Sequence, residues 1–399
     1  MIHIIIRTFQ IIAIFGCVSS SLYYLLCLWG AASFLRARRA DERYRATQDL
    51  PSVSILKPLK GVDPEIYENF RSHCLEDYPE YEIIFGVSDT DDPAVASVDR
   101  LQREFPNRNI RLIICPEKLG PNVKVSNLEQ MMQSARYEHL ILNDSDIRVE
   151  RDYLRRVMTP FVGPNGERVG MVTCLYRAVA ANTLGSQLES LGVTDFCAGV
   201  LAAHQLEGGP RFGLGSTLAF RRADLERIGG FRAIVDYLAD DYELGRRVAG
   251  LGLEVKLSEV VVETHLPTYD LSEFLAHQLR WARGVRASRP GGYFGLISTF
   301  GLMWALLNLI AAHTAPWSWA VLGAVVFLRL AVALVVGKAV LRDQHLIGNL
   351  WLLPLRDLLA VAIWMASYVG HTVTWRGDAF VLKEGKLHPK VVEKFQQTN

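Results

Sequence analysis

The sequence predicts an α/β domain with a mostly parallel central sheet, attached to a membrane by helices at both ends. Three observations predict this arrangement. Strand-like apolar runs alternate with helical stretches in the middle of the chain, a pattern typical of parallel sheets with right-handed crossovers. An uncharged run from Ile11 to Leu35 is long enough to cross a bilayer core of roughly 30 Å. The last third of the chain is again rich in apolar residues.

The N-terminal run predicts a membrane anchor over residues 1–35 and a basic linker over residues 36–50. A signal peptide would have a shorter apolar core and a small-residue cleavage site. Arginines follow the run instead, so the positive-inside rule predicts that this flank is cytoplasmic. These arginines are Arg36, Arg38, Arg39, Arg43 and Arg45.

Composition excludes several classes of protein. The chain has 399 residues, of which 50% are hydrophobic, and a formal net charge of +1. A nearly neutral protein is a poor candidate for nucleic-acid binding. The six cysteines show no Cys-x-x-Cys spacing, which argues against a zinc or redox site and predicts reduced thiols. The soluble part, residues 51–290, suits one α/β domain.

Within this domain, strands and helices are predicted in alternation. The predicted strands are 52–56, 81–87, 111–115, the run that begins at His139, 169–174, a strand-like segment at 211–220, and 253–262. The predicted helices are 64–74, 94–105, 126–135, 184–206, a helix ending at 225–230, one opening at Asp240, and an amphipathic helix at 277–286.

Aspartates follow two of the strands. Asp89 and Asp92 come after the second strand, and Asp144 and Asp146 come after the fourth. Ligands of open α/β sheets bind at the carboxyl ends of strands, where clustered carboxylates repel unless a metal or a donor group lies between them. Two carboxylates on alternate residues can share a divalent cation that holds a diphosphate. The pattern therefore indicates a nucleotide-diphosphate sugar with Mn²⁺ or Mg²⁺. A solvated acidic turn is the alternative for each cluster.

Other candidate residues each have a structural alternative. Lys124 enters a helix, where positive charge beside backbone N–H groups suits a diphosphate, but a lone surface lysine is common. Asp240 and Asp241 open a helix, so Asp240 could be an N-cap and Asp241 a base, or both could serve the helix dipole. His265 could be a third metal ligand or a satisfied histidine. Arg280 could bind a diphosphate bidentately or a lipid headgroup.

The C-terminal third predicts membrane helices over residues 291–375 and a polar tail over residues 376–399. The candidate spans are 293–312, 317–337 and 346–369, and re-entrant or interfacial helices are the alternative for each. Arg356 and Asp357 are adjacent within the last span. Because they point to different helix faces, we expect each to have a partner elsewhere.

Six stretches together resemble a known family. The chain is similar to the ceramide glucosyltransferase-like enzymes (glycosyltransferase family 21, family-2-like, with a GT-A fold), which include a related bacterial hopanoid glycosyltransferase. The resemblance covers nearly the whole chain. The matching stretches are Ser54-Ile-Leu-Lys-Pro-Leu-Lys-Gly61, Ser88-Asp-Thr-Asp-Asp-Pro-Ala94, Lys124-Val-Ser-Asn-Leu128, Asp144-Ser-Asp-Ile-Arg-Val149, Ala239-Asp-Asp-Tyr242 and Arg280-Trp281.

The resemblance implies roles for the aspartates. Asp92, with Asp89 nearby, matches the family's first aspartate, at the nucleotide. Asp144 matches the second, at the nucleotide sugar, and Asp146 completes a metal pair with it. Asp241 matches the third, the proposed general base.

The resemblance also implies roles on the other side of the site. Arg280 and Trp281 end the family's last motif and, with Lys124, are expected at the nucleotide sugar. Asp240 and His277 are expected on the acceptor side. The family has Gln or Arg where this chain has His277, which leaves the usual role of that position open.

The resemblance thus predicts an integral membrane enzyme with a cytoplasmic catalytic domain, in a bacterial inner membrane. It would transfer a hexose, with inversion, from a UDP-sugar to a lipid hydroxyl. The expected partners are the UDP-sugar, a ceramide or hopanoid acceptor, the membrane and Mn²⁺ or Mg²⁺, with no nucleic acid. One alternative is a hopanoid transferase that uses UDP-N-acetylglucosamine, favoured by the stretch 238–244. A second is a non-catalytic membrane scaffold on the same fold.

Overall fold

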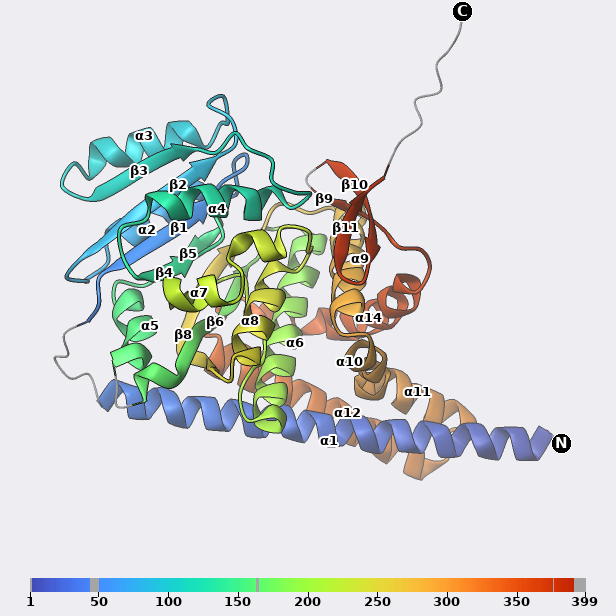
Figure 1. Ribbon diagram of the computed structural model, residues 1–399. Helices are drawn as coiled ribbons and strands as arrows, with labels where there is room; N and C mark the ends of the chain where they lie inside the picture. Colours follow the sequence, from blue (N-terminus) through green and yellow to red (C-terminus); the bar gives the residue numbers. More distant parts are fainter. Residues whose placement is uncertain (1, 44–49, 163–164, 376, 391–399) are drawn as a thin grey trace, which may run out of the picture.

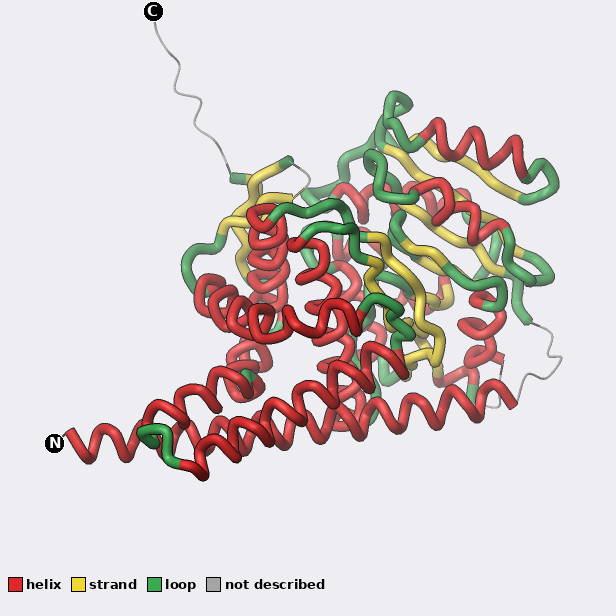
Figure 2. Tube along the Cα trace, turned by 180° about the vertical axis from the view of Figure 1, so that it is seen from behind, coloured by secondary structure: helices red, strands yellow, loops and turns green. Residues whose placement is uncertain are grey.

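The computed structural model describes residues 2–43, 50–162, 165–375 and 377–390. An α/β domain lies against a group of long helices, and a small second sheet lies beside these helices (Figure 1). Seen from behind, the small sheet is separate from the central sheet (Figure 2). All six cysteines are buried and free.

The central sheet has eight strands in the order β3-β2-β1-β4-β7-β6-β8-β5. Strands β1 to β4 are mutually parallel, β7 runs antiparallel between β4 and β6, and β8 is parallel to β6. The mostly parallel sheet expected from the sequence is confirmed. The strands are β1 (Val53–Pro58), β2 (Tyr81–Val87), β3 (Asn109–Ile114), β4 (His139–Leu142), β5 (Ile147–Arg148), β6 (Val169–Val179), β7 (Leu218–Arg221) and β8 (Glu254–His265).

Helices cover both faces of this sheet (Figure 1). Alternate strand residues point to opposite faces, so Ile55 joins the core on one face and Leu56 joins the core on the other. Strands buried on both faces are nearly continuous apolar runs, as β2 is. The helices are α2 (Ile66–Cys74), α3 (Val95–Glu104), α4 (Val123–Ser134), α5 (Tyr153–Val162), α6 (Leu184–Glu207), α7 (Arg222–Arg227), α8 (Asp240–Gly250) and α9 (Leu271–Ser288).

Helix α1 (Ile2–Arg43) extends beyond the predicted anchor, so the first part of the expected linker is helical. Residues 44–49 lie outside the described residues. At 1.5 Å per residue, α1 is about 63 Å long, roughly twice the thickness of a bilayer core. The helix packs against α6 and β8 as well as against apolar helices. Arg38, expected on the basic flank, is buried and donates hydrogen bonds to the carbonyls of Glu259 and Val340.

Three described helices are long and apolar enough to cross a membrane: 4–40, 316–340 and 346–367. A pair bent by 50°, 290–299 with 301–311, would be a fourth if it forms one span. These are the helices of an integral membrane protein. The C-terminal ones are α10 (Pro290–Gly295), η3 (Leu296–Thr299), α11 (Gly301–Ala311), α12 (Pro316–Val332) with the π-helix η4 (Ala333–Val340), α13 (Leu346–Asn349), η5 (Leu350–Leu352) and α14 (Leu353–Ser367).

Three charged residues within these helices, Arg329, Arg356 and Asp357, have partners. Arg329 lies 2.8 Å from Asp357 and 2.9 Å from Asp195 of α6. Arg356 donates a hydrogen bond to Gln278 of α9. The adjacent Arg356 and Asp357 therefore have different partners, as their opposite helix faces predicted.

Strands form at the end of the predicted membrane region, residues 291–375, and in the predicted polar tail, residues 376–399. Strands β9 (Thr372–Trp375), β10 (Asp378–Lys383) and β11 (Lys386–Pro389) form an antiparallel sheet. Its small apolar core consists of Val373, Phe380, Leu382 and Leu387. The sheet holds the loop before α8, because the N–H of Leu238 donates to Gly385 and the N–H of Leu387 donates to Asp236.

Candidate active site

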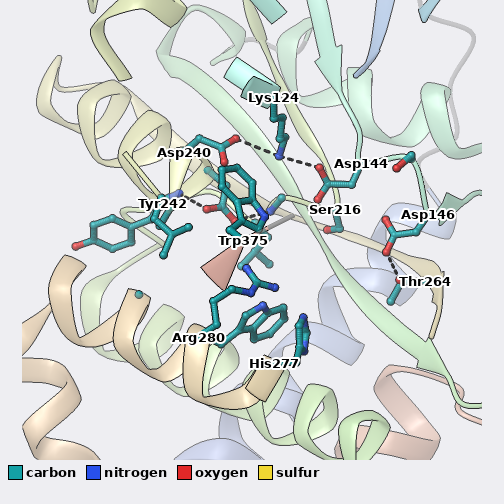
Figure 3. A pocket seen from close by; sticks show the side chains of 18 of the residues that line it. Lys124, Asp144, Asp146, Ser216, Asp240, Tyr242, Thr264, His277, Arg280 and Trp375 are labelled. Atoms are coloured by element: carbon teal, nitrogen blue, oxygen red, sulfur yellow. Dashed lines mark hydrogen bonds and ion pairs between the residues drawn. The ribbon is translucent and has the colours of Figure 1, made fainter. Parts of the chain in front are cut away.

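A cavity of about 700 Å³ opens at the carboxyl edge of the central sheet. Its walls come from the ends of β1, β4 and β8, the starts of α4 and α8, one face each of α6 and α9, and the small sheet. Most of the predicted site residues line it (Figure 3). They are Lys124, Asp144, Asp146, Asp240, Asp241, His265, His277, Arg280 and Trp281.

Lys124 connects two of the aspartates. Asn122 caps α4 by accepting a hydrogen bond from the N–H of Val125, which places Lys124 in the first turn. Its Nζ lies 2.7 Å from Asp144 and 3.1 Å from Asp240 (Figure 3). Burial would lower the pKa of Lys124, but the two carboxylates outweigh burial and raise it. The ammonium group therefore stays charged.

Asp240 is not the N-cap of α8. The cap position is Ala239, and Asp240 is the first helical residue. Its carboxylate faces Lys124 instead. The negative charge still lies at the positive end of the helix dipole, which is favourable.

Asp241 is held by backbone groups. One carboxylate oxygen accepts from the N–H of Gly215 at 2.8 Å, and the other accepts from Tyr242 at 2.7 Å. Burial and the charge of Asp240 raise the pKa of Asp241 to about 6. A carboxylate with this pKa is mostly ionised at neutral pH and can still take up a proton, as a general base must.

Gly215 keeps space open between two carboxylates. A Cβ atom added there would lie 3.0 Å from an oxygen of Asp144 and 3.2 Å from an oxygen of Asp241. Only a residue without a side chain leaves both groups undisturbed. The two aspartates, one after β4 and one in α8, therefore border the same small volume.

Hydrogen bonds from neighbouring strands support the segment that carries Asp144 and Asp146. Lys57 of β1 is fully buried and donates a hydrogen bond to the backbone carbonyl of Asp144 at 3.0 Å. Burial lowers the pKa of Lys57 to about 7. Thr264 donates to Asp146 at 2.5 Å. Burial and neighbouring Asp144 raise the pKa of Asp146 to about 6.

The carboxylates in the cavity could supply some of the ligands that a hard divalent cation needs. Asp144 and Asp146 offer carboxylate oxygens in one cavity, and Mg²⁺-type ions often bind one or two carboxylates plus substrate phosphates. Among residues 2–43, 50–162, 165–375 and 377–390, no three His, Cys, Asp or Glu side chains are gathered closely enough to hold a metal. His265 lines the cavity, and its buried ring Nδ1 has no hydrogen-bond partner within the described part of the chain. Its role as a third ligand stays a prediction.

Asp89 and Asp92 do not line this cavity. Asp92 accepts hydrogen bonds from the N–H groups of Gly61 and Ala94, and so holds the loop after β1 against the start of α3. Asp89 accepts from the N–H of Asp91. The structure thus gives both residues a loop-supporting contact, and their contact with a nucleotide stays a prediction.

The wall opposite the aspartates is aromatic. His277 lies between Tyr269 and Trp281, with ring centroids 5.4 and 5.3 Å away. Trp281 in turn meets Phe196 of α6 edge to face. Arg280 extends from the same helix into the cavity (Figure 3). The two residues that end the last motif therefore reach the site from α9.

Sequence reasoning missed several residues of the lining. Trp375, Asp378 and Phe380 come from the small sheet, and Glu189 comes from α6. The sequence signal for the small sheet was the alternation of apolar and polar residues over 372–389, interrupted by glycines at 377 and 385. The signal for Glu189 was weaker, because it is a carboxylate in a mostly apolar helix.

Comparison with protein families identifies the chain. Residues 12–388 match the family described as Glycosyl transferase family 21. The chain belongs to glycosyl transferase family 21. Its family-21 relatives include ceramide glucosyltransferase 3 of Caenorhabditis elegans, which is 26% identical over 94% of this chain and 82% of the relative. Ceramide glucosyltransferase 1 of the same organism is 23% identical over 94% of this chain and 81% of the relative.

Solved structures show the same fold. A mannosyltransferase from Pyrobaculum calidifontis, solved in complex with GDP-Man and Mn²⁺, matches with a TM-score of 0.50 and 20% identity. The match covers 90% of this chain and 99% of the mannosyltransferase chain. The predicted GT-A-like fold, with apolar helices at both ends, is thereby confirmed. This family-21 protein is a glycosyltransferase of a membrane-associated type.

Proposed function

We propose that the protein is an inverting glycosyltransferase that moves a hexose from a UDP-sugar to a lipid hydroxyl. One observation carries the proposal. The Lys124–Asp144 ion pair, the Asp241 carboxylate and an apolar helix wall all border one cavity of a protein with membrane helices. The positive charge of Lys124 suits the diphosphate of the donor, and the apolar wall suits an insoluble acceptor. The names of the ceramide glucosyltransferase relatives support the lipid.

The donor would lie along the carboxyl edge of the sheet. Lys124 and Arg280 supply positive charge from two sides of the cavity, and Arg280 can bind a phosphate group bidentately. Asp144 and Asp146 would hold Mn²⁺ or Mg²⁺, which when bound neutralises charge on the departing diphosphate. Lys124 would then exchange part of its contact with Asp144 for the diphosphate. Trp281 would pack beside the sugar.

Asp241 would act as the base in a single displacement. The lipid oxygen attacks the anomeric carbon opposite the diphosphate, and its proton passes to a carboxylate oxygen of Asp241. The bond to the diphosphate oxygen breaks, and its electron pair leaves with UDP. The backbone N–H groups of Gly215 and Tyr242 leave lone pairs free on the carboxylate for this proton. Asp240 keeps Lys124 in place beside the site.

The acceptor would enter between α6 and α9. Their cavity-facing residues Val193, Phe196 and Val285 offer apolar contact for a lipid chain. The arginines at the end of α1 support a catalytic domain on the cytoplasmic side. A hopanoid acceptor with UDP-N-acetylglucosamine as donor remains the second candidate, on the sequence pattern at 238–244.

The test uses the full-length protein in nanodiscs. It is incubated with Mn²⁺, a panel of labelled UDP-sugars, and either ceramide or a hopanoid polyol. Transfer of label to one lipid class supports the proposal and selects between the two acceptors. Absence of transfer together with absence of UDP–Mn²⁺ binding in calorimetry would establish the scaffold alternative.

A further inference from the structure

Helix α6 carries a buried carboxylate that the transfer step does not use. Most buried residues of this helix are apolar or small, yet Glu189 is buried with an exposed fraction of only 1%. A carboxylate removed from water is costly unless it is hydrogen-bonded. Glu189 also lines the cavity. A charge placed at such a cost beside a substrate cavity indicates a ligand-binding role.

One oxygen of Glu189 has a fixed partner. The side-chain amide of Gln278 donates to its Oε2 at 2.9 Å. The carbonyl of Gln278 in turn accepts from Arg356 of α14 at 3.1 Å. Neither Gln278 nor Arg356 lines the cavity. This chain of contacts fixes the carboxylate from behind, starting in a membrane helix.

The other oxygen faces His277, with which it makes an incomplete contact. Nδ1 of the imidazole lies 3.2 Å from Oε1. The two are not aligned for a hydrogen bond, and this buried Nδ1 has no hydrogen-bond partner among the described residues. Both residues border the cavity. A hydroxyl group that lies beside both atoms could donate to the carboxylate and accept from the imidazole.

Apolar residues continue the same two helix faces. On α6, Val193 and Phe196 follow Glu189 at helical spacing, and on α9 Trp281 and Val285 follow His277. The rings of Phe196 and Trp281 are in contact. The groove between α6 and α9 is therefore polar at one end and apolar beyond it, which matches an amphiphile.

The polar end lies near the reacting groups. Tyr176 of β6 is partly buried and lines the same cavity. Asp146, Asp241 and Glu189 line this cavity as well. Because Asp241 and Glu189 border one cavity, a single acceptor headgroup could contact both.

We propose that Glu189 and His277 form a second headgroup site, which binds a hydroxyl of the acceptor other than the one that reacts. This deepens the proposed function and rests on it. The acceptor class that fits is a lipid with at least two hydrogen-bond donors in its headgroup. Charge-assisted hydrogen bonds of this kind change affinity by roughly 10- to 100-fold.

The test measures binding without turnover. The full-length protein in nanodiscs is titrated with a long-chain vicinal diol and with the mono-alcohol of the same chain length. The wild type should bind the diol about 10- to 100-fold more tightly. Glu189→Gln, which keeps the shape but loses the charge, should lose most of this preference. His277→Asn should reduce it by a smaller factor.

A matched control comes from the same helix. Asp195→Asn makes the same chemical change at a residue that does not line the cavity, and it should keep the diol preference. Thermal unfolding in the nanodiscs verifies that each variant is folded. A wild type without diol preference, or a Glu189→Gln variant that retains it, would overturn the inference. So would an equal loss in Asp195→Asn.

The two proposals fail separately. If the protein transfers sugar to a lipid but shows no diol preference, the headgroup site is wrong and the proposed function stands. If the diol preference depends on Glu189 but no UDP-sugar is bound or used, the proposed function is wrong and the amphiphile site remains.

Discussion

The two long walls of the cavity are built in different ways. On the sheet side, Asp144 follows β4 and is paired with Lys124, and Asp241 lies in the first turn of α8 and is held by backbone N–H groups. On the helix side, α6 and α9 contribute mainly aromatic and apolar groups. Their one buried carboxylate, Glu189, is fixed through a chain of contacts that begins in the membrane helix α14. In the proposed reaction, the sheet would position the reacting groups, whereas helices that contact the membrane region would shape the space for the acceptor.

The strongest test of this comparison removes the base from the sheet wall. Asp241→Asn should lower kcat by roughly 10²- to 10⁴-fold, since a positioned general base contributes about that much. Binding of UDP and Mn²⁺, measured by calorimetry, should change little because the variant keeps the shape of the site. Asp99→Asn, an exposed aspartate on α3, is the matched control. Near-normal turnover in Asp241→Asn would rule out this residue as the base.

A second test crowds the same wall without changing its charge. In Gly215→Ala the new Cβ would press on Asp144 and Asp241 at 3.0 and 3.2 Å. Displacement of reacting groups by a fraction of an ångström should lower kcat by roughly 10- to 100-fold. Affinity for the acceptor should stay within a small factor, because the helix wall is untouched. If acceptor KM rises and kcat does not, the two walls are not independent in the way described.

The pH dependence should distinguish activity from stability. Asp241 must be ionised to accept a proton, so kcat/KM should fall about tenfold per pH unit below its pKa of about 6. Stability has the opposite sign. The folded pKa values of Asp146 and Asp241 lie above their ordinary value of 3.8, so their contribution is greatest below about pH 4 and is lost as pH rises through 6. Initial rates with Mn²⁺ measure the activity over this pH range, and thermal unfolding without added metal measures the stability. Parallel curves would contradict the assignment.

The smallest expected effect concerns the packing beneath the base. In α8, a Cβ at Gly245 would lie 2.1 Å from the backbone N of Gly213, so Gly245→Ala should lower stability by about 1–3 kcal/mol. Gly250→Ala in the same helix meets nothing within 4 Å and should be neutral or stabilising by up to about 1 kcal/mol. Chemical denaturation of both variants measures the difference. Equal stabilities would mean that α8 is not tightly packed against the loop below Asp241.

The sequence predicted the sheet side of the site better than the helix side. Alternating apolar runs located β1, β2 and β4, and the rule that ligands bind at strand ends placed Asp144 and Asp146 correctly in one cavity. Asp241 joined them through the resemblance to the family rather than through periodicity. Asp89 and Asp92 satisfy the same strand-end rule, yet hydrogen bonds within their loops hold them away from the cavity. Proximity to a strand end does not decide which way a side chain turns.

The residues of the helix side could not be located from the sequence for a different reason. An apolar helix such as α6 has the same composition whether it faces lipid, a core or a groove, so Glu189 could not be placed without its partner Gln278. Of the small sheet, β9 was assigned to the end of the membrane region and β10 and β11 to a polar tail, because these strands are short and follow membrane helices. Its contribution of Trp375 depends on contacts between segments far apart in the chain, which no local pattern specifies.

The backbone hydrogen bonds that join Gly385 and Leu387 to the loop before α8 have a consequence for biosynthesis. The loop leaves the ribosome early, but the strands that hold it are made only after all the membrane helices. At a synthesis rate of about 5–20 residues per second, the loop before Asp241 would exist for on the order of ten seconds before the small sheet that holds it is made. A chain whose apolar helices fail to insert would leave this loop unsupported. The proposed catalytic centre would then be completed only in molecules whose helices are already in the bilayer, beside the proposed lipid acceptor.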